Sequence, residues 1–387
     1  MFVFRDRVQG VVFMMEMSRK PESLVAIFVA TSGHSGIDRL VKNLVPALAR
    51  RGYSVDVLKI KGHGPHLDEW PAGVRLIDLG ARHVYSSLAA VARYLKQNHP
   101  AVLLTDKDRV NRTAILARAW AGVPTRLVVS SGTTISIDLA NRGRFERWLQ
   151  KYSMRYLYPL ADNIIANSKG VADDMAAYTG LERKRINVVP RPVVSENLFH
   201  DRLPRPDHPW FQPGEPPVIL GVGELGPRKD FVTLIKAYAK LRDRTPSRLV
   251  IIGKGKDHDQ LHATAQQLGV AKDVDLRGFV PYPYPYMAHA GLLAMTSRWE
   301  GLGFVLIEAL AVGTPVVSTK CPSGPSEILD GGRYGQLVPV GDVNGLAQAM
   351  YATLIAPLPA AMLQKAARPY EIENSTTAYL AAMGLRR

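Results

Sequence analysis

Apolar runs of strand length alternate with helical patterns along most of the chain. The first run, residues 24–30, ends in a Gly-containing loop, after which apolar residues recur every three or four positions as far as Arg50. Residues 54–58 form the next apolar run. This order indicates a βαβ unit, and such units build parallel sheets that bind ligands at the carboxyl ends of their strands. Further strands of the same half are expected at 74–79, 101–104, 126–129, 163–167 and 186–189.

A proline-rich segment divides this pattern into two halves. Residues 201–217 hold six prolines, which neither a helix interior nor a central strand tolerates. Strand-length apolar runs then resume at 218–222, 249–252, 274–276, 292–295 and 316–318. The pattern predicts an α/β protein with two doubly wound, Rossmann-like domains, residues 21–200 and 218–368, a linker at 201–217 and a final helix within 369–387.

Length and charge narrow the class of protein. With 387 residues, each half is long enough for a core of its own. The formal net charge of +15 indicates an anionic partner, either a phosphorylated substrate or an acidic membrane surface. No nucleic-acid-binding motif accompanies that charge, so nucleic acid is not expected as a partner. The single cysteine, Cys321, excludes internal disulfides and a cysteine-based zinc site.

Residues 1–20 lack the features of a targeting segment. Their short apolar cluster at 11–15 is interrupted by Glu16, and no small-residue cleavage site follows. We therefore expect a non-native or disordered extension, with Met14, Met15 or Met17 as alternative start positions. No apolar run elsewhere approaches the roughly 20 residues that a membrane-spanning helix needs.

The most informative stretch is SRWEGLGFVLIEALAVGTPVVSTKCPSGPSEIL, residues 297–329. It is typical of a glycine-containing loop, a short helix at 304–312, a strand and a second loop of small residues. Both loops can aim unpaired backbone N–H groups into one cleft, where such groups suit anions and sugar oxygens. Glu300 lies in the first loop and Glu308 in the helix. A helical carboxylate can accept two vicinal hydroxyls, and a carboxylate in a loop can reach a reacting centre.

This stretch resembles the signature of the family-4 retaining glycosyltransferases of GT-B fold, E-G-x-G, E-A and G-x-P-V-V with seven residues between the two glutamates. The chain is similar to the bacterial lipopolysaccharide and exopolysaccharide glycosyltransferases of that family. The resemblance implies that the two domains face a central cleft and that the final helix crosses back to the first domain. It also implies that Glu300 lies against the donor sugar as the catalytic residue and that Glu308 binds the nucleotide ribose.

The same resemblance implies the rest of the donor site. The donor phosphates would be bound by Arg228, Lys229 and the loop at Gly36. The donor sugar would meet the backbone of the two loops at Gly301, Leu302, Gly303, Ser323 and Gly324, and the nucleobase would meet Gly278, Phe279 and Val280. The donor is expected to be a UDP-sugar or a GDP-sugar, with no metal and no other cofactor. The acceptor is expected to be a glycan or a lipid-linked glycan.

Residues 221–226 also match G-x-G-x-x-G, the fingerprint of dinucleotide-binding enzymes. In that fingerprint the third glycine lies at the start of the helix, whereas here the helix is expected only from about 230. The next strand ends at Gly253, where a dinucleotide site would need an acid. An oxidoreductase is therefore disfavoured. The adjacent Arg228 and Lys229 instead suit a diphosphate, the arginine as a fork and the lysine as a point charge.

The chain departs from the family pattern in several loops. Glu224 stands where the family has an arginine, which leaves Arg228 as its substitute, and the Gly-Gly of the first loop is Ser35-Gly36 here. Gly132 stands where many relatives carry a histidine, so no catalytic role transfers to that position. His34 is either an acceptor-side base or a solvated loop residue.

Two further clusters are assigned no function. Asp106 and Asp108 mimic the D-x-D metal motif of another glycosyltransferase fold, but the surrounding pattern is not that fold, and no metal is expected. The tyrosines that alternate with prolines at 282–286 are expected to form a rigid surface loop rather than a platform for the base.

A basic and aromatic helix is predicted from Arg142 to Tyr158. Its cations recur at three and four positions beside an aromatic and apolar stripe: Arg144, Arg147, Lys151 and Arg155 next to Phe145, Leu149, Tyr152 and Tyr156, with Trp148 between them. Such a helix can lie on an anionic bilayer with its rings at the level of the headgroups. Alternatively, the aromatic face packs on the domain core and the basic face is simply solvated.

Together these features predict a retaining, metal-independent glycosyltransferase of hexosyltransferase type, acting in cell-envelope polysaccharide synthesis. It would move a sugar from a nucleotide-diphosphate sugar to a glycan or lipid-linked acceptor. We expect it in the cytoplasm, either free or peripherally attached to the inner face of the plasma membrane. The alternative is a catalytically degenerate partner that binds a sugar nucleotide within a glycan-assembly complex.

Overall fold

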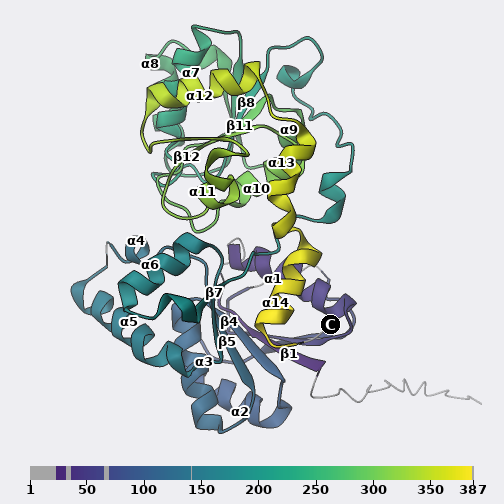
Figure 1. Cartoon of the computed structure of the whole chain (residues 1–387), viewed down its shortest axis with the longest axis vertical. Helices are drawn as coiled ribbons and strands as arrows, with labels where there is room; N and C mark the ends of the chain where they lie inside the picture. The colour runs from purple at the N-terminus through teal and green to yellow at the C-terminus, as the bar shows by residue number, and fades with distance from the viewer. Residues whose placement is uncertain (1–22, 32–35, 65–68, 141, 386–387) are drawn as a thin grey trace, which may run out of the picture.

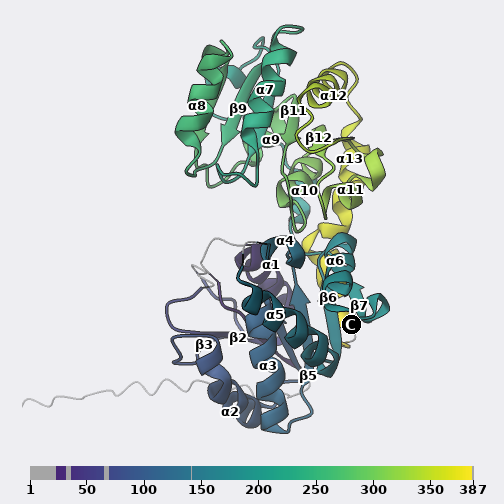
Figure 2. The same ribbon diagram turned by 90° about the vertical axis from the view of Figure 1, so that its left-hand side faces the viewer.

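The computed structural model describes residues 23–31, 36–64, 69–140 and 142–385, which form two α/β lobes stacked end to end (Figures 1 and 2). The N-lobe comprises the elements from β1 to β7, and the C-lobe those from β8 to α13. The last helix, α14, returns to the N-lobe and packs on α1. The expected extension 1–20 and the loop residue His34 lie outside the described residues.

The N-lobe contains a seven-stranded parallel sheet of order β3-β2-β1-β4-β5-β6-β7. The apolar runs predicted each of these strands to within two residues. The strands are β1 (Leu24–Phe28), β2 (Ser54–Lys59), β3 (Val74–Asp78), β4 (Val102–Asp106), β5 (Arg126–Ser131), β6 (Asn163–Ala166) and β7 (Ile186–Val188). The strand order reverses between β1 and β4, and the carboxyl ends of these two strands face the C-lobe.

Helices cover both faces of the N-lobe sheet. On one face lie α1 (Gly36–Arg50) and α14 (Ile372–Ala382); on the other lie α2 (Leu88–Asn98), α3 (Asp108–Ala121), α5 (Arg144–Leu157) and α6 (Lys169–Thr179), with the short α4 (Ile135–Asp138) against α6. The alternation of β1 supplies both cores. Val25 and Ile27 join the α1 and α14 cluster, whereas Ala26 and Phe28 join the opposite one.

The C-lobe contains a six-stranded parallel sheet of order β10-β9-β8-β11-β12-β13. Its strands are β8 (Val218–Val222), β9 (Arg248–Ile252), β10 (Val274–Gly278), β11 (Leu292–Met295), β12 (Val316–Thr319) and β13 (Gln336–Val338). The sequence did not predict β13. It is three residues long, and only Val338 in it is fully buried, so it leaves no apolar run to recognise.

Helices also cover both faces of the C-lobe sheet. One face carries α7 (Phe231–Arg242), α8 (His258–Gln267) and α12 (Val343–Ile355); the other carries α9 (Tyr284–His289), α10 (Phe304–Ala311), α11 (Pro325–Ile328) and α13 (Ala360–Ala367). The expectation of a rigid surface loop at 282–286 was wrong, because α9 begins at Tyr284. Prolines fit the first turn of a helix, and Tyr286 is buried in the C-lobe core.

The chain passes between the lobes twice, near residues 189–194 and 370–372, and the two passages are hydrogen-bonded to each other. The Val193 N–H donates to the Tyr370 carbonyl at 2.8 Å, and the Ile372 N–H donates to the Val194 carbonyl at 2.9 Å. The proline-rich segment 201–217, expected as the linker, lies on the C-lobe instead of spanning the gap. Its Phe211 belongs to the C-lobe core.

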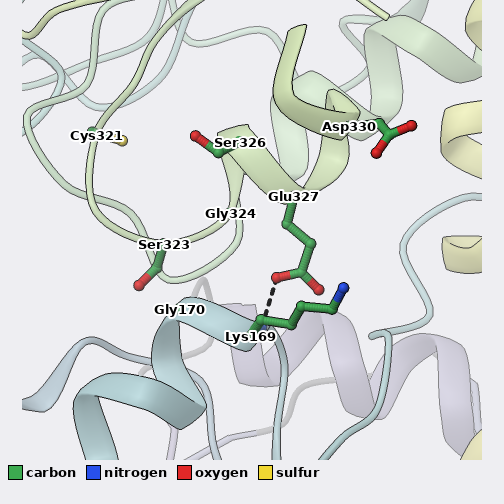
Figure 3. A pocket seen from close by; sticks show the side chains of 8 residues that line it. All are labelled: Lys169, Gly170, Cys321, Ser323, Gly324, Ser326, Glu327 and Asp330. Carbon is green, nitrogen blue, oxygen red and sulfur yellow. Dashed lines mark hydrogen bonds between the residues drawn. The ribbon is translucent and has the colours of Figure 1, made fainter. Parts of the chain in front are cut away.

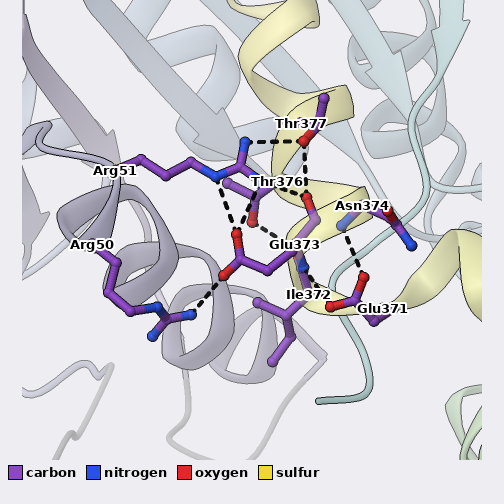
Figure 4. Close-up of polar contacts among 8 residues, drawn as sticks. All are labelled: Arg50, Arg51, Glu371, Ile372, Glu373, Asn374, Thr376 and Thr377. Atoms are coloured by element: carbon purple, nitrogen blue, oxygen red, sulfur yellow. Dashed lines mark hydrogen bonds and ion pairs between the residues drawn. The ribbon is translucent and has the colours of Figure 1, made fainter. Parts of the chain in front are cut away.

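Glu373 fastens α14 to the end of α1 (Figure 4). Its carboxylate accepts hydrogen bonds from Arg50 at 2.9 Å and from two nitrogens of Arg51 at 2.9 and 3.1 Å. Burial opposes ionisation of this group, but hydrogen bonds from the two arginines, and then their charges, outweigh it and hold the pKa of the Glu373 carboxyl below its usual value. The C-terminal segment is thereby locked to the N-lobe.

We predict that Glu373→Gln lowers the free energy of unfolding at pH 7 by about 0.5–1 kcal/mol, a modest value because the side chain is half exposed. A carboxyl with a depressed folded-state pKa contributes stability above its unfolded-state pKa of about 4.3, and loses it as the pH falls through the lower folded-state pKa. Urea unfolding should therefore separate variant and wild type at pH 7 and bring them together near pH 3. Glu215→Gln, at an exposed position, is the control; a gap that persists at pH 3 would contradict the assignment.

Candidate active site

Glu300 is a buried carboxylate held by three donors in the loop between β11 and α10. Lys229 Nζ donates to Oε1 at 2.7 Å, Ser297 Oγ to Oε1 at 2.8 Å and Arg228 Nη1 to Oε2 at 2.7 Å. Burial alone would raise the pKa of Glu300, but the charges of Lys229 and Arg228 outweigh it and keep that pKa below its usual value. The sequence predicted all three charged residues as donor-site residues, but it did not predict that they bind one another.

The loop that carries the two cations is fastened to the loop that carries the glutamate. The Arg298 N–H donates to the Arg228 carbonyl at 2.8 Å, and Thr296 Oγ1 donates to the Lys229 carbonyl at 2.8 Å. Arg298 Nε also donates to Asp230 at 3.0 Å, where Asp230 begins α7 with a φ of 49°. Two loops at the carboxyl end of the C-lobe sheet therefore form one rigid cationic unit around Glu300.

Of the glycines at 221, 223 and 226, the middle one makes room for the lysine rather than for a dinucleotide. A Cβ on Gly223 would lie 2.6 Å from Lys229 Cε, so only glycine lets the lysine stem pass. The third glycine, Gly226, has open space around it and precedes α7 by several residues, so it does not pack a helix on a strand. This arrangement supports the interpretation that disfavoured an oxidoreductase.

The glycine loop after Glu300 rests directly on the N-lobe. A Cβ on Gly301 would overlap the Gly132 carbonyl, so Gly301 permits the close approach of two backbones. Ser168 Oγ donates to the Gly301 carbonyl at 3.0 Å, and Thr134 Oγ1 donates to the Glu300 carbonyl at 3.1 Å. The N-lobe therefore contributes to the position of the Glu300 loop.

The second small-residue loop lies against the first. A Cβ on Gly324 would overlap the Leu302 carbonyl, while Leu302 itself is buried. Gly303 adopts a φ of 95° at the start of α10. Ser323 Oγ lies 3.1 Å from Thr134 Oγ1 of the N-lobe. The predicted loop residues are thus gathered into one interlobe layer.

Glu308 lies in α10, the helix that follows the Glu300 loop, and its carboxylate binds an arginine of the N-lobe. Its Oε1 forms an ion pair with Arg39 of α1 and accepts a hydrogen bond from Tyr284 at 3.3 Å. The Arg39 guanidinium also lies 5.5 Å from the centre of the Phe304 ring. No local sequence pattern links Arg39 or Tyr284 to Glu308, and both were missed as site residues.

The other predicted donor residues lie on both sides of the gap. Gly36 begins α1 in the N-lobe, and a Cβ there would approach Phe304 of the C-lobe to 3.3 Å. Gly278 ends β10, and its carbonyl accepts the Gly253 N–H at 2.8 Å. Phe279 is exposed, and Val280 packs on the C-lobe core.

The two aspartates of the D-x-D sequence bind arginines. Asp106 is buried in an ion pair with Arg191, and Asp108 pairs with Arg112 at 2.6 Å. Within the residues that the structure describes, His, Cys, Asp and Glu side chains form no group of three suited to a metal ion. In this structure both carboxylates are thus paired with arginine side chains.

Two family models together match most of the chain. "Glycosyl transferase 4-like domain" matches residues 35–192, and "Glycosyl transferases group 1" matches residues 207–369. The lipopolysaccharide core biosynthesis glycosyltransferase LpsE of Rhizobium meliloti is 30% identical over 318 residues, which cover 81% of this chain and 84% of that protein. The chain belongs to the group 1 glycosyltransferases.

A second relative and a solved structure extend this result. The N-acetylgalactosamine-N,N'-diacetylbacillosaminyl-diphospho-undecaprenol 4-alpha-N-acetylgalactosaminyltransferase of Campylobacter jejuni is 34% identical over 247 residues. The match covers 64% of this chain and 65% of that enzyme, just under two thirds of its length. The crystal structure of Anabaena HepE in complex with UDP matches with a TM-score of 0.73 and 17% identity, covering 94% of this chain and 99% of that one. At this identity the likeness shows the fold, which is the GT-B fold of two facing Rossmann-like lobes.

A pocket of about 370 Å³ opens between the lobes of this glycosyltransferase beside the second loop (Figure 3). The Glu327 carboxylate accepts the Lys169 N–H across the lobes at 2.6 Å, and burial raises the pKa of Glu327 despite that bond. The pocket is lined by Lys169, Gly170, Cys321, Ser323, Gly324, Ser326, Glu327 and Asp330. These residues bring hydroxyl, carboxylate and ammonium groups to its walls. Such a lining suits a ligand rich in hydroxyls.

We predict that Gly301→Ala reduces sugar transfer by roughly 100-fold, because its Cβ would push the Glu300 loop away from Gly132 by a substantial part of an ångström. The variant should still fold, because the added methyl group lies at the interlobe surface and not in the core of either lobe. Gly226→Ala is the matched control, because it adds a methyl group to the neighbouring loop in open space. The measurement is turnover of donor by the two variants at equal concentrations of folded protein. Equal activity would contradict a close contact between Gly301 and the Gly132 carbonyl.

Proposed function

We propose that this glycosyltransferase moves a sugar from a nucleotide-diphosphate sugar to a glycan or lipid-linked acceptor in cell-envelope polysaccharide synthesis, with retention at the anomeric carbon. The observation that carries the proposal is the buried Glu300 ionised by two cations at the interlobe face. The names of the Rhizobium and Campylobacter relatives concern lipopolysaccharide core and an undecaprenol-linked glycan, and the Anabaena neighbour holds UDP. These support an envelope acceptor and a nucleotide donor.

Leaving-group stabilisation is the main electrostatic requirement of such a reaction. As the bond from sugar to diphosphate breaks, negative charge develops on the nucleoside diphosphate. Arg228 and Lys229 carry two positive charges and Glu300 one negative charge, so the cluster retains one positive charge. Only one of the five N–H groups of Arg228 and one of the three of Lys229 is used on Glu300, which leaves donors for phosphate oxygens. We propose that these cations, rather than a metal ion, balance the departing charge.

The two glutamates would hold the ends of the donor. Glu300 is ionised and rigid, so it can orient the donor sugar through a hydroxyl beside the glycine loop at Gly301. Glu308 would bind the ribose hydroxyls, for which its second oxygen and a partial displacement of Arg39 would serve. We propose that the acceptor hydroxyl attacks from the same face as the leaving phosphate, so that no protein nucleophile is required. The base, UDP or GDP, would meet the segment at 278–280.

We predict that Arg228→Gln weakens the binding of UDP or GDP by roughly 10- to 100-fold, the loss expected for one charged hydrogen bond to phosphate. Arg298→Gln is the matched control, because Arg298 is a neighbouring half-exposed arginine that pairs with Asp230 instead of Glu300. Calorimetric titration with both nucleotides is the measurement. Wild-type affinity of the Arg228→Gln variant would remove Arg228 from the site. Binding without any turnover of a nucleotide sugar would favour the degenerate-partner alternative.

An exposed aromatic helix supports attachment to an anionic membrane. In α5 the side chains of Phe145, Trp148 and Tyr156 are 73%, 55% and 66% exposed, and Met154 is the buried residue of the helix. One of the two open interpretations was that the aromatic face packs on the N-lobe core. These exposures contradict it. Ring centroids follow one another at 6.1, 5.2 and 6.3 Å from Phe145 through Trp148 and Tyr152 to Tyr156.

Basic side chains flank this row of aromatic rings in α5. The combination of cations and aromatic rings suits the headgroup region of an anionic bilayer. Within the described part of the chain, no helix has the length and apolarity needed to cross a bilayer. We propose that α5 lies on the surface of the membrane that carries the lipid-linked acceptor, at its cytoplasmic face.

We predict that the double variant Arg144→Gln/Arg147→Gln binds vesicles with anionic lipid more weakly by roughly 30-fold, since each basic group near such a surface contributes about 1 kcal/mol. The control Lys256→Gln/Lys272→Gln removes the same charge from exposed positions of the C-lobe. Co-flotation with vesicles of neutral and of anionic composition is the measurement. Equal flotation of both double variants, or no preference of the wild type for anionic vesicles, would contradict the proposal.

A further inference from the structure

We propose that Arg191 is a positioning residue for sugar transfer, which sets the start of α1 at Gly36, the N-lobe loop at Gly132 and, through Gly132, the loop of Glu300. The inference rests on the proposed function. Arg191 lies between two prolines in the first passage between the lobes, outside the predicted donor site.

Arg191 and Asp106 form a buried pair beneath the interlobe surface. Each side chain is 3% exposed, and Arg191 Nη2 binds Asp106 Oδ2. Ser130 Oγ donates to the same oxygen at 3.1 Å. The other terminal nitrogen, Arg191 Nη1, donates to the Gly36 carbonyl at 3.3 Å, where α1 begins. One guanidinium thus connects the end of β4 to the start of α1.

The same guanidinium fills the space beside Gly132. A Cβ built on Gly132 would lie 2.9 Å from Arg191 Cζ and closer still to Nη2, so no larger residue fits there while Arg191 holds this position. Asn167 Nδ2 donates to the Gly132 carbonyl at 3.1 Å, and Gly301 approaches that carbonyl from the C-lobe. Arg191, Gly132 and Gly301 are therefore stacked in this order beneath Glu300.

The backbone of Arg191 is anchored where the lobes join. The Pro190 carbonyl accepts Ser375 Oγ of α14 at 2.5 Å, and the Pro192 carbonyl accepts Asn43 Nδ2 of α1 at 2.8 Å. The Arg191 side chain starts from this fixed point and ends at the start of α1 and at the Gly132 loop, so it transmits the position of the interlobe passage to both.

The net charge of this cluster decides how Arg191 can act. Within the described residues, Arg191 Nε and Asn167 Oδ1 are buried and have no hydrogen-bond partner. Buried polar atoms without a partner lower the free energy of unfolding. Because Asp106 neutralises the guanidinium, Arg191 has little net charge to offer the donor phosphates. It is expected to act through geometry, on turnover rather than on nucleotide affinity.

The test compares Arg191→Lys with Arg75→Lys. The lysine keeps the charge but cannot span Asp106, Gly36 and Gly132 with one planar fork. Arg75 makes a bidentate pair with the buried Asp56 at the edge of the same sheet, remote from the loops, and serves as the matched control. Gly132→Ala disturbs the same contact from the other side, and serves if Arg191→Lys does not fold.

The readouts are calorimetric affinity for UDP and GDP, melting temperature, and kcat and KM for release of nucleoside diphosphate from UDP- and GDP-hexoses. For Arg191→Lys and Gly132→Ala we expect kcat to fall roughly 10- to 100-fold while nucleotide affinity changes by less than about threefold. Arg75→Lys should keep wild-type kcat even if it melts earlier. Unchanged kcat in both site variants, or a loss of activity that only follows the folded fraction, would overturn the inference. A wild-type protein that neither binds nor turns over any of these nucleotides would instead refute the proposed function.

Discussion

The rest of the site depends on the interaction between the buried, ionised carboxylate of Glu300 and the groups that surround it. Removing such a group from water is unfavourable by several kcal/mol unless opposite charges and hydrogen bonds surround it. Lys229, Arg228 and Ser297 provide both, and they come from two different loops of the C-lobe. The negative charge of Glu300 therefore joins those loops into one unit. Because two cations surround one carboxylate, the unit keeps a net positive charge on the side that faces the N-lobe.

The N-lobe completes this unit through backbone contact more than through charge. Gly301 lets its main chain approach that of Gly132 in the N-lobe, where any side chain would intervene, and Thr134 and Ser168 donate across the gap. The ion pair of Arg39 with Glu308 adds charge to the same interface. A site built this way responds to small displacements of either lobe, which suits a reaction in which two substrates must be aligned and water excluded.

The sequence predicted the fold well because parallel strands in a doubly wound sheet are buried on both faces and form continuous apolar runs. It failed for β13, of whose three residues only one is buried, and for α9, where alternating Tyr and Pro suggested a loop. In the site, the two glutamates and two cations were predicted as neighbours of the donor, and their roles remain proposals. What the sequence could not show is which groups pair over long distances. Arg39 with Glu308, and Arg191 beneath Gly132, depend on how the lobes meet, and no periodicity records that.

The most direct test is a crystal structure of the protein grown with UDP or with GDP. The account predicts a nucleoside diphosphate between the lobes, with phosphate oxygens within hydrogen-bond distance of Arg228 and Lys229 and the ribose hydroxyls on Glu308. A nucleotide bound elsewhere on the molecule, or phosphates that touch neither cation while Glu300 keeps both, would contradict it.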